Sequence, residues 1–370
     1  MAITPDVARR LVDRGHRVAV ESGAGVPAGH DDLDYKAVGA EIVDDDGGWH
    51  GDLVATVGRP SPGTTVRGAL VGLLQPFDDP AGLAVLAASG GATLFAFEAV
   101  PRTTRAQVVD ALSSQATVLG YRGALEAAAR IDRLFPMLTT AAGTIRPAKV
   151  LVLGAGVAGL QAIATARRLG AAVSAFDVRA EAGEQVRSIG ATFIELDAPV
   201  QDASTSGGYA QEVAADEQAR IVAGLAPHVA VADAVITAAA IPGRRAPLMI
   251  DDEMVASMRR GAVIVDLAAA TGGNCSATHP GRTVDVDGVT IVGDTDLVSR
   301  VAGDASAMLA RNVAAFVELV SGDDGNFVTD WDDDIVAASC VARDGVLVHP
   351  RLKAAAESDD TDGPTTSEAP

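Results

Sequence analysis

Three glycines at fixed spacing carry the chemistry that is most easily recognised in this chain. Gly154, Gly156 and Gly159 follow the apolar run 149–153 and precede a segment typical of a helix. In a strand–turn–helix unit the first glycine permits a tight turn, the second lets a pyrophosphate approach the backbone, and the third lets the helix pack closely on the strand. The N–H groups at the start of the helix then face the phosphates. The spacing predicts a dinucleotide site; the alternative is a glycine-rich turn of a parallel sheet that binds no ligand.

An acidic residue stands where such a site needs one. Asp177 ends the next apolar run, about 20 residues beyond the turn, where a carboxylate can accept hydrogen bonds from the ribose diol of NAD. The same charge repels the additional 2′-phosphate of NADP. Arg179 weakens this inference slightly, although its alternative role is to cover the adenine. We therefore predict NAD(H), rather than NADP(H), as the cofactor of this chain.

The composition bounds the class of protein. With 370 residues, of which 48% are hydrophobic, the chain is long enough for two globular domains. Its net charge is −20, and it has three lysines against 26 arginines. So acidic a chain argues against nucleic-acid binding, which needs a basic surface. It also indicates a salt-adapted, halophilic source, because high ionic strength screens the self-repulsion.

The sequence offers little support for a membrane, disulfide or metal role. It has no purely apolar run of about 18 residues or more and no cationic, apolar signal segment at its start, so we expect a cytoplasmic protein without a membrane span of its own. Cys275 and Cys340 are too few for a disulfide framework, and no cluster has the spacing of metal ligands. The acidic runs 44–46 and 332–334 are interpreted as solvated surface.

Short apolar runs alternate with helical patterns, which predicts an α/β fold with parallel sheets. Besides the strands beside the turn, we expect strands at 17–20, 53–57, 69–74, 92–97, 192–195, 233–237, 262–266 and 289–292. A long helical pattern covers 104–132, and a last helix at 304–320 has the pattern to pack on the first lobe. The prediction is two Rossmann-like lobes, formed by residues 1–112 plus 302–356 and by residues 113–301, the second being a complete dinucleotide-binding fold. The acidic tail 357–370 is predicted to be disordered.

Several further segments carry a family resemblance. They are 102–115 (RTTRAQVVDALSSQ), 120–122 (GYR), 177–179 (DVR), 207–210 (GGYA), 237–243 (TAAAIPG), 265–268 (VDLA), 272–275 (GGNC) and 299–301 (SRV). Together with the turn, they resemble the soluble NAD(H)-binding alpha subunit (domain I) of proton-translocating NAD(P) transhydrogenase. Alanine dehydrogenases share this architecture. The resemblance extends over roughly residues 1–352.

The resemblance implies a concrete activity. In that family the component forms a homodimer and binds NADH between two Rossmann-like lobes. NADP(H) is held by a partner membrane subunit, and hydride passes directly from NADH to NADP⁺. That subunit and a short membrane subunit couple the step to proton translocation. The implied location is cytoplasmic, with peripheral association to the cytoplasmic membrane through these partners.

The resemblance also implies site residues. Those implied in catalysis are Arg102, Gln107, Asp110, Ser113 and Tyr209. Those implied in cofactor binding are Arg102, Thr103, Thr104, Gln107, Val108, Val109, Asp110, Gly154, Ala155, Gly156, Val157, Gly159, Asp177, Val178, Arg179, Gly208 and Ala240.

Two of these residues have a physical rationale of their own. The amide of Gln107 can hold the nicotinamide carboxamide through a donor and an acceptor at once, and Arg102 and Asp110 can orient that amide. Tyr209 lies in a glycine- and serine-rich segment of the kind that forms lids. Without the resemblance, Arg102, Gln107 and Asp110 are interpreted as a solvated helix start. The alternative for Tyr209 is an exposed loop with an incidental aromatic residue.

The sequence departs from the family at two places. The strand and arginine-ending loop that usually precede the segment matching 1–5 are absent, and Thr56 occupies the segment in which a lysine is common. The pattern of alanine dehydrogenases contains this arginine, this lysine and a histidine near 73–76, and all three are absent here. The runner-up hypothesis is an alanine dehydrogenase. That enzyme reduces an imino acid, so it needs a proton donor and cationic side chains that bind the substrate carboxylate. A third hypothesis is an NAD-binding sensor without hydride chemistry, against which Gln107 and Tyr209 argue.

Overall fold

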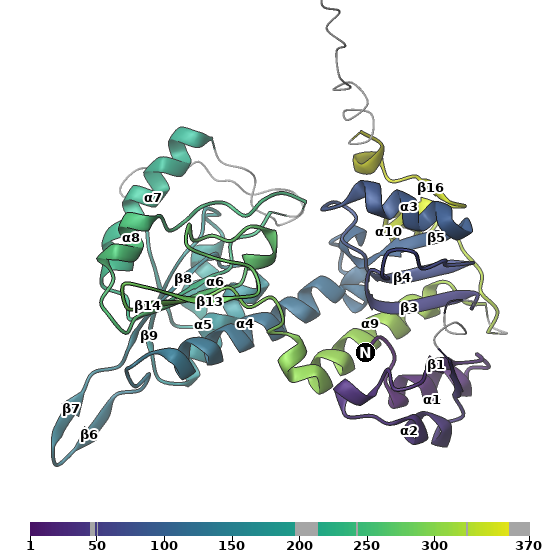
Figure 1. The fold of residues 1–370 in the computed structure, drawn as a ribbon, viewed down its shortest axis with the longest axis horizontal. Helices are drawn as coiled ribbons and strands as arrows, with labels where there is room; N and C mark the ends of the chain where they lie inside the picture. Colours follow the sequence, from purple (N-terminus) through teal and green to yellow (C-terminus); the bar gives the residue numbers. More distant parts are fainter. Residues whose placement is uncertain (45–48, 50, 197–213, 242, 323–324, 355–370) are drawn as a thin grey trace, which may run out of the picture. The chain divides into compact units, whose positions relative to one another are not determined.

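The computed structural model of the chain describes residues 1–44, 49, 51–196, 214–241, 243–322 and 325–354. The chain divides into two compact units: unit 1 is Met1–Ser114 with the chain from Val301 onward, and unit 2 is Gln115–Arg300. The first division falls inside helix α4 (Ala111–Arg130) and the second just before helix α9 (Ala302–Leu319) (Figure 1). None of the helices in the described ranges has the length and apolar character that a membrane span requires.

Unit 2 is built on a seven-stranded sheet. Its strands are β8 (Lys149–Leu153), β9 (Ala172–Phe176), β10 (Thr192–Phe193), β11 (Ala234–Thr237), β12 (Val263–Asp266), β13 (Thr283–Val286) and β14 (Val289–Val292). They lie in the order β10-β9-β8-β11-β12-β14-β13, all parallel except β13, which pairs antiparallel with β14. The order reverses between β8 and β11, and ligands of doubly wound sheets bind at the carboxyl ends of the strands at such a reversal.

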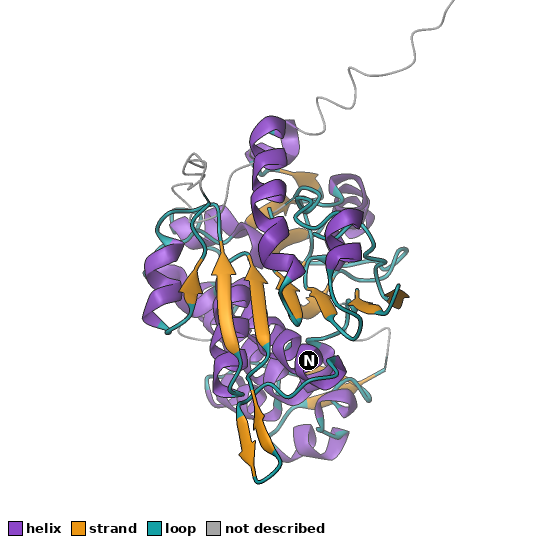
Figure 2. Cartoon of the chain, turned by 90° about the vertical axis from the view of Figure 1, so that its left-hand side faces the viewer, coloured by secondary structure: helices purple, strands orange, loops and turns teal. Residues whose placement is uncertain are grey.

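Both faces of this sheet are covered by apolar packing. Val150 and Val152 of β8 lie in a cluster with Ile163 of α5 (Val157–Arg168), while Leu151 and Leu153 lie in a second cluster. Successive side chains of a strand point to opposite faces, so one apolar strand supplies both cores. The unit also contains α4 from Gln115 onward, α6 (Ala182–Ser188), α7 (Ala215–Ala230) and α8 (Asp252–Ser257), with the short 3₁₀ turn η4 (Ala269–Thr271). A second 3₁₀ turn, η5 (Ser299–Val301), lies at the boundary with unit 1. Figure 2 shows these helices and strands by type.

A two-stranded hairpin extends from unit 2. Its strands β6 (Leu138–Thr140) and β7 (Gly143–Ile145) pair antiparallel, and every residue in them is exposed. Met137, Leu138 and Ile145 are 65%, 44% and 45% exposed. Figure 1 shows the hairpin projecting from the sheet of its unit.

Unit 1 contains a mixed five-stranded sheet in the order β16-β15-β5-β4-β3. The parallel strands are β3 (Leu53–Gly58), β4 (Ala69–Leu73) and β5 (Thr93–Ala96), and β15 (Cys340–Arg343) and β16 (Val346–Leu347) add antiparallel pairs. A separate parallel pair joins β1 (Ala19–Glu21) to β2 (Glu41–Val43). The helices are α1 (Pro5–Asp13), α2 (Asp32–Ala37), α3 (Pro80–Gly90), α9 and α10 (Asp334–Ser339), with 3₁₀ turns η1 (Val26–Ala28), η2 (Phe97–Ala99) and η3 (Arg105–Val109).

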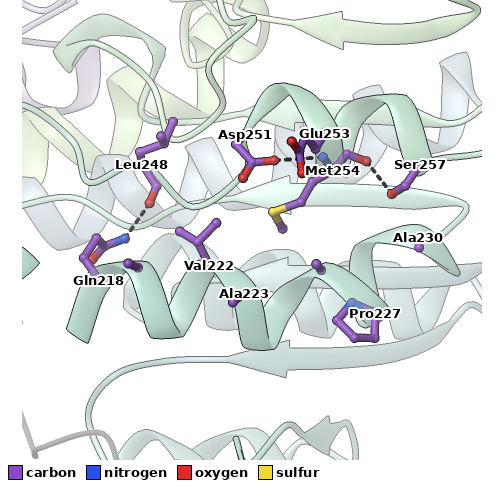
Figure 3. Close-up of a pocket in the computed structure, with 12 residues that line it drawn as sticks. Gln218, Val222, Ala223, Pro227, Ala230, Leu248, Asp251, Glu253, Met254 and Ser257 are labelled. Atoms are coloured by element: carbon purple, nitrogen blue, oxygen red, sulfur yellow. Dashed lines mark hydrogen bonds between the residues drawn. The ribbon is translucent and has the colours of Figure 1, made fainter. Parts of the chain in front are cut away.

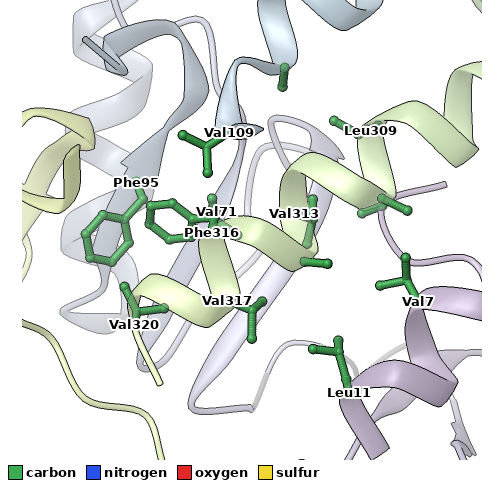
Figure 4. Packing of buried hydrophobic residues seen from close by; sticks show 14 of the residues in the cluster. Val7, Leu11, Val71, Phe95, Val109, Leu309, Val313, Phe316, Val317 and Val320 are labelled. Carbon is green, nitrogen blue, oxygen red and sulfur yellow. The ribbon is translucent and has the colours of Figure 1, made fainter. Parts of the chain in front are cut away.

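The core of unit 1 forms around α9. Phe316 of α9 packs on Phe95 of β5 with ring centroids 5.1 Å apart, and Val313 and Val317 extend the same apolar face toward α1 (Figure 4). The C-terminal segment of the chain therefore supplies much of the core of the N-terminal lobe.

The predicted fold class, two Rossmann-like lobes of α/β type, is confirmed, with two differences in the elements. The helix expected at 104–132 is wrong in one respect, because it breaks at Asp110 into η3 and α4. The Asp110 carboxylate accepts hydrogen bonds from the Ser113 backbone N–H (2.9 Å) and hydroxyl (2.6 Å), which caps α4 and starts it at Ala111. The hairpin β6–β7 and the antiparallel strands β15 and β16 had no clear signal in the sequence.

Candidate functional site

The glycine turn joins β8 to α5, and two of its glycines serve the packing of the turn itself. Gly154 has a φ of +94°, and a Cβ at this position would lie 2.7 Å from the backbone nitrogen of Ala239. A Cβ on Gly159 would overlap the carbonyl oxygen of Gly154. Only glycine fits these two positions without displacing the backbone.

Gly156 differs, because nothing in the described chain requires a glycine there. Its φ is −75°, and a Cβ would meet no atom within 4 Å. The residue is the N-cap of α5, whose first N–H groups have no acceptor within the helix and whose positive dipole end favours an anion. The space above Gly156 is therefore available to a pyrophosphate, and the turn fits a dinucleotide.

Asp177 follows β9 and ties this strand to the glycine turn. One oxygen of its carboxylate accepts the N–H of Ala155 at 2.7 Å. The guanidinium of Arg179 donates to both oxygens, from Nε and Nη2, at 2.9 Å each. The side chain of Asp177 is only 6% exposed. The charge of this carboxylate is thus largely balanced by Arg179. It therefore repels a 2′-phosphate less strongly than an isolated carboxylate would.

A buried network at the ends of β11 and β12 supports the other side of the turn. Asp266 is fully buried and accepts hydrogen bonds from the Thr237 hydroxyl (2.9 Å), the Thr278 hydroxyl (2.6 Å) and the Asn274 backbone N–H (2.7 Å). The Asn274 amide in turn donates to the carbonyl of Ala239 at 2.8 Å, and its oxygen accepts the Ala239 N–H at 3.2 Å. Ala239 abuts Gly154, so the network fixes the backbone beside the turn.

One local signal for this network exists in the sequence, an aspartate at the end of a buried strand. By itself this signal does not distinguish a structural role from a catalytic one.

Ala240, predicted to bind cofactor, follows Ala239 and is exposed. Val157 and Val178 are half-buried beside the turn and Asp177.

The second group of predicted residues lies in unit 1, on η3. Side chains three residues apart eclipse in a 3₁₀ helix, which gives η3 three faces. Ala106 and Val109 are 1% and 0% exposed and face the core. Gln107 is exposed and shares its face with Thr104 and Asp110, whereas Arg105 shares the third face with Val108. Val109 can therefore touch a cofactor only through its backbone, because its side chain lies in the core.

The remaining predicted residues fall into three groups. Arg102 and Thr103 are exposed on the loop before η3. Asp110 and Ser113 are half-buried and engage each other at the start of α4. Gly208 and Tyr209 lie outside the described residues.

The two predicted groups belong to different units: the residues from Arg102 to Ser113 belong to unit 1, and those of the glycine turn, Asp177 and Ala240 to unit 2.

A groove elsewhere in unit 2 contains none of the predicted residues. It has a volume of about 820 Å³ and lies between α7 and α8 (Figure 3). Its lining is mainly apolar and includes Val222, Ala226, Leu248 and Met254. The groove is thus separate from the glycine turn in its composition and its position.

Comparison with known proteins identifies the family. Residues 1–119 match the family described as "Alanine dehydrogenase/PNT, N-terminal domain", and residues 123–350 match "Alanine dehydrogenase/PNT, C-terminal domain". The chain belongs to the alanine dehydrogenase/PNT family.

Within this family, the chain is similar to transhydrogenase subunits. It is 43% identical to an NAD(P) transhydrogenase subunit alpha protein of Rhodospirillum rubrum over 95% of each chain. The crystal structure of transhydrogenase from Sinorhizobium meliloti matches with a TM-score of 0.83 and 39% identity, over 94% of this chain and 95% of that one. An L-alanine dehydrogenase structure matches with a TM-score of 0.78 and 26% identity, over 96% and 95%. The fold is common to both branches, and the sequence is nearer to the transhydrogenases.

A further cluster of charged residues lies at the edge of the unit 1 sheet. At the carboxyl ends of β3, β4 and β5, Arg59 donates to the carbonyls of Leu74 (2.9 Å) and Gln75 (3.0 Å) and to the Asp79 carboxylate (2.6 Å). Glu98 accepts the N–H groups of Leu74 (3.2 Å) and Gln75 (2.7 Å), and burial raises its pKa. The guanidinium of Arg59 is thus bound by groups of the protein itself.

Proposed function

We propose that this chain is the NAD(H)-binding alpha subunit of a proton-translocating NAD(P)⁺ transhydrogenase. The single observation that carries the proposal is the 43% identity to a transhydrogenase subunit alpha protein over 95% of both chains. The open position at Gly156, at the N-terminus of α5, supports binding of a dinucleotide by this chain. The activity we propose is hydride transfer between NADH held here and NADP⁺ held by a partner.

Different residues of the chain would bind different parts of the cofactor. The backbone from Gly154 to Val157 would receive the pyrophosphate, and the adenosine ribose would lie beside Asp177. Because this carboxylate already accepts four hydrogen bonds from Ala155 and Arg179, it would exchange some of the Arg179 bonds for the ribose hydroxyls. When bound, NADH supplies a hydride from C4 of its dihydronicotinamide ring. Gln107 would fix the carboxamide of that ring, since an exposed amide offers a donor and an acceptor together. No proton donor is needed, so orientation and exclusion of water are the tasks of the protein.

The partners follow from what the activity requires. The hydride acceptor would be NADP(H) on a larger membrane subunit, and a short membrane subunit would complete the proton path. We further propose a homodimer, located on the cytoplasmic side of the membrane. The hairpin β6–β7 supports the dimer, because it exposes Met137, Leu138 and Ile145, and an isolated two-stranded hairpin is only marginally stable in water.

The geometry favours this function over alanine dehydrogenase. Reduction of an imino acid needs a cationic anchor for the substrate carboxylate and a proton donor. At the edge of the unit 1 sheet, Arg59 is engaged by two carbonyls and Asp79, and its side chain is only 18% exposed. The described residues of this edge therefore offer a poor site for a carboxylate substrate.

A mixing experiment tests the proposal. The purified chain is combined with a candidate NADP-binding partner domain, and the reduction of an acetylpyridine analogue of NAD by NADPH is followed. We expect turnover only when both proteins are present, and no NADH oxidation by the chain alone with pyruvate and ammonia. Robust alanine formation by the isolated chain would overturn the proposal in favour of alanine dehydrogenase.

A further inference from the structure

The turn that carries Gln107 is held by residues far away in the chain. On the third face of η3, the Arg105 guanidinium binds the Asp333 carboxylate through two parallel hydrogen bonds, from Nη1 at 2.6 Å and from Nη2 at 2.9 Å, and it also contacts Asp334. Paired bonds of this kind fix direction as well as distance. The run 332–334, interpreted from the sequence as solvated surface, is therefore partly a structural contact: the side chain of Asp333 is 18% exposed.

Asp333 is itself fixed to the core. Its carboxylate caps α10 by accepting the N–H groups of Ile335 (2.9 Å) and Val336 (3.1 Å). Ile335 and Val336 are 1% and 0% exposed in the cluster that contains Phe316. Arg105 thus binds an acceptor that is attached to α10 and, through it, to the core of the unit.

A second contact holds the other end of the turn. Asn312 of α9 is 8% exposed, and its amide nitrogen donates to the carbonyl of Val108 at 2.9 Å. Its amide oxygen accepts the Ser114 hydroxyl at 2.8 Å. One side chain of α9 therefore joins the end of η3 to the first turn of α4, and Figure 4 shows Val109 packed in the same cluster as Val313 and Phe316.

These contacts hold η3 through positions other than the side chain of Gln107. The side chains of Ala106 and Val109 are buried, the guanidinium of Arg105 is bound by Asp333, and Asn312 binds the backbone carbonyl of Val108, whose side chain is 63% exposed. Gln107 is exposed on the face that it shares with Thr104 and Asp110. We propose that the Arg105–Asp333 ion pair and Asn312 are positioning residues that fix the orientation of Gln107 for hydride transfer. This inference rests on the function proposed above.

The ion pair is the better target for a test, because it lies at the surface and its loss should leave the chain folded. We expect Arg105→Ala to lower the rate of hydride transfer about tenfold, since displacement of a reacting group by ~1 Å can cost about 100-fold. The Kd for NADH should stay within about twofold, because the glycine turn and Asp177 are untouched. Asp333→Asn keeps the cap of α10 and removes the charge, so its effect should be smaller and in the same direction.

The double variant and a control separate positioning from stability. Arg105→Ala with Asp333→Asn should be no slower than Arg105→Ala alone, because the two side chains act as one unit. Arg14→Ala is the matched control: it removes an arginine that binds Glu318 of α9 at 2.7 Å, in the same unit, away from η3. A merely structural role predicts that the rate follows the melting temperature in all these variants alike, and that result would overturn the proposal.

A readout without cofactor completes the test. The backbone N–H groups of Ala106, Gln107 and Asp110 bond within the turn, to Thr103, Thr104 and Gln107. Their hydrogen exchange in the cofactor-free chain should accelerate in Arg105→Ala and in Asn312→Asp, and stay unchanged in Arg14→Ala. Unchanged exchange in Arg105→Ala would refute the anchoring. A wild-type chain that transfers no hydride with any NADP-binding partner refutes the proposed function instead, and the exchange measurement still decides whether the clamp exists.

Discussion

The glycine turn of unit 2 and the η3 turn of unit 1 are positioned in different ways. The side-chain link that ties the glycine turn to β9, from Ala155 to Asp177, spans 22 residues. The links that hold η3 span 204 residues to Asn312 and 228 residues to Asp333. The first site is linked within one strand–helix–strand unit and supported by the neighbouring strand end at Ala239, whereas the second depends on the return of the C-terminal helices to the first lobe.

The two turns should therefore be sensitive to different kinds of substitution. The glycine turn depends on steric fit, because Cβ atoms at Gly154 and Gly159 would strike backbone. The η3 turn depends on polar contacts from α9 and α10, of which one is an ion pair with half-exposed Arg105. Substitutions can therefore test steric fit at the glycine turn and the polar contacts that hold η3.

The largest effect is expected within the glycine turn, from a matched pair of alanine substitutions. Gly159→Ala places a Cβ on the carbonyl oxygen of Gly154, so we expect a loss of stability of at least about 1–3 kcal/mol and loss of NADH binding. Gly156→Ala meets nothing within 4 Å and needs no unusual φ, so the fold should keep its stability. Its affinity for NADH should nevertheless fall about tenfold or more, about 1.4 kcal/mol.

Thermal unfolding by circular dichroism and NADH titration check this pair. An unchanged NADH affinity in Gly156→Ala would mean that no phosphate approaches the turn, and it would remove the main structural support for a dinucleotide in unit 2.

The same contrast explains which features could be predicted from the sequence and which could not. The glycine turn, Asp177 and the parallel strands were predictable, because each is a local pattern of glycines and apolar runs. The break at Asp110 was missed, because the helical pattern continues through it and the aspartate cap competes only through its side chain. Arg105, Asn312 and Asp333 had no signal, since a clamp across about 200 residues follows from tertiary packing and leaves no local spacing.

A prediction for η3 concerns its exposed amide. Gln107→Asn shortens the side chain by one methylene, so the amide can no longer reach the same position relative to the ring. We expect hydride transfer to fall by about 100-fold while NADH affinity changes little. Stopped-flow turnover with the NADP-binding partner, beside NADH titration, measures both quantities. Equal losses in rate and affinity would instead indicate that Gln107 only contributes to binding.

A third prediction returns to unit 2, where Asp177 and Arg179 neutralise each other. Asp177→Ala should weaken NADH binding by about 1–3 kcal/mol, because hydrogen bonds to a charged acceptor are lost. It also leaves Arg179 without this acidic partner, beside the expected 2′-position, so the affinity for NADPH should rise relative to NADH. Titrations of both nucleotides at high salt check the ratio. A preference for NADH that survives in Asp177→Ala would assign the selectivity to other residues.

The smallest effect concerns the Arg105–Asp333 ion pair of unit 1. Hydrogen bonds from Arg105 lower the pKa of Asp333 from its ordinary value to about 2. A pKa that is lower in the folded chain than in the unfolded chain stabilises the fold above the unfolded value, about 3.9, and this stabilisation is lost as the pH falls from about 4 toward 2. Because Arg105 is half-exposed, the contribution should stay below about 1 kcal/mol.

Urea unfolding of wild type and Arg105→Ala tests this sign. Trp49 and Trp331, the two tryptophans of the chain, both lie in unit 1, so their fluorescence reports this unit. The difference in unfolding free energy should be constant between pH 7 and pH 5 and should shrink as the pH falls below about 4. The Gly159→Ala destabilisation of unit 2, followed by circular dichroism, is steric and should show no such dependence. A clamp contribution that disappears already near pH 6 would mean that a group other than Asp333 holds Arg105.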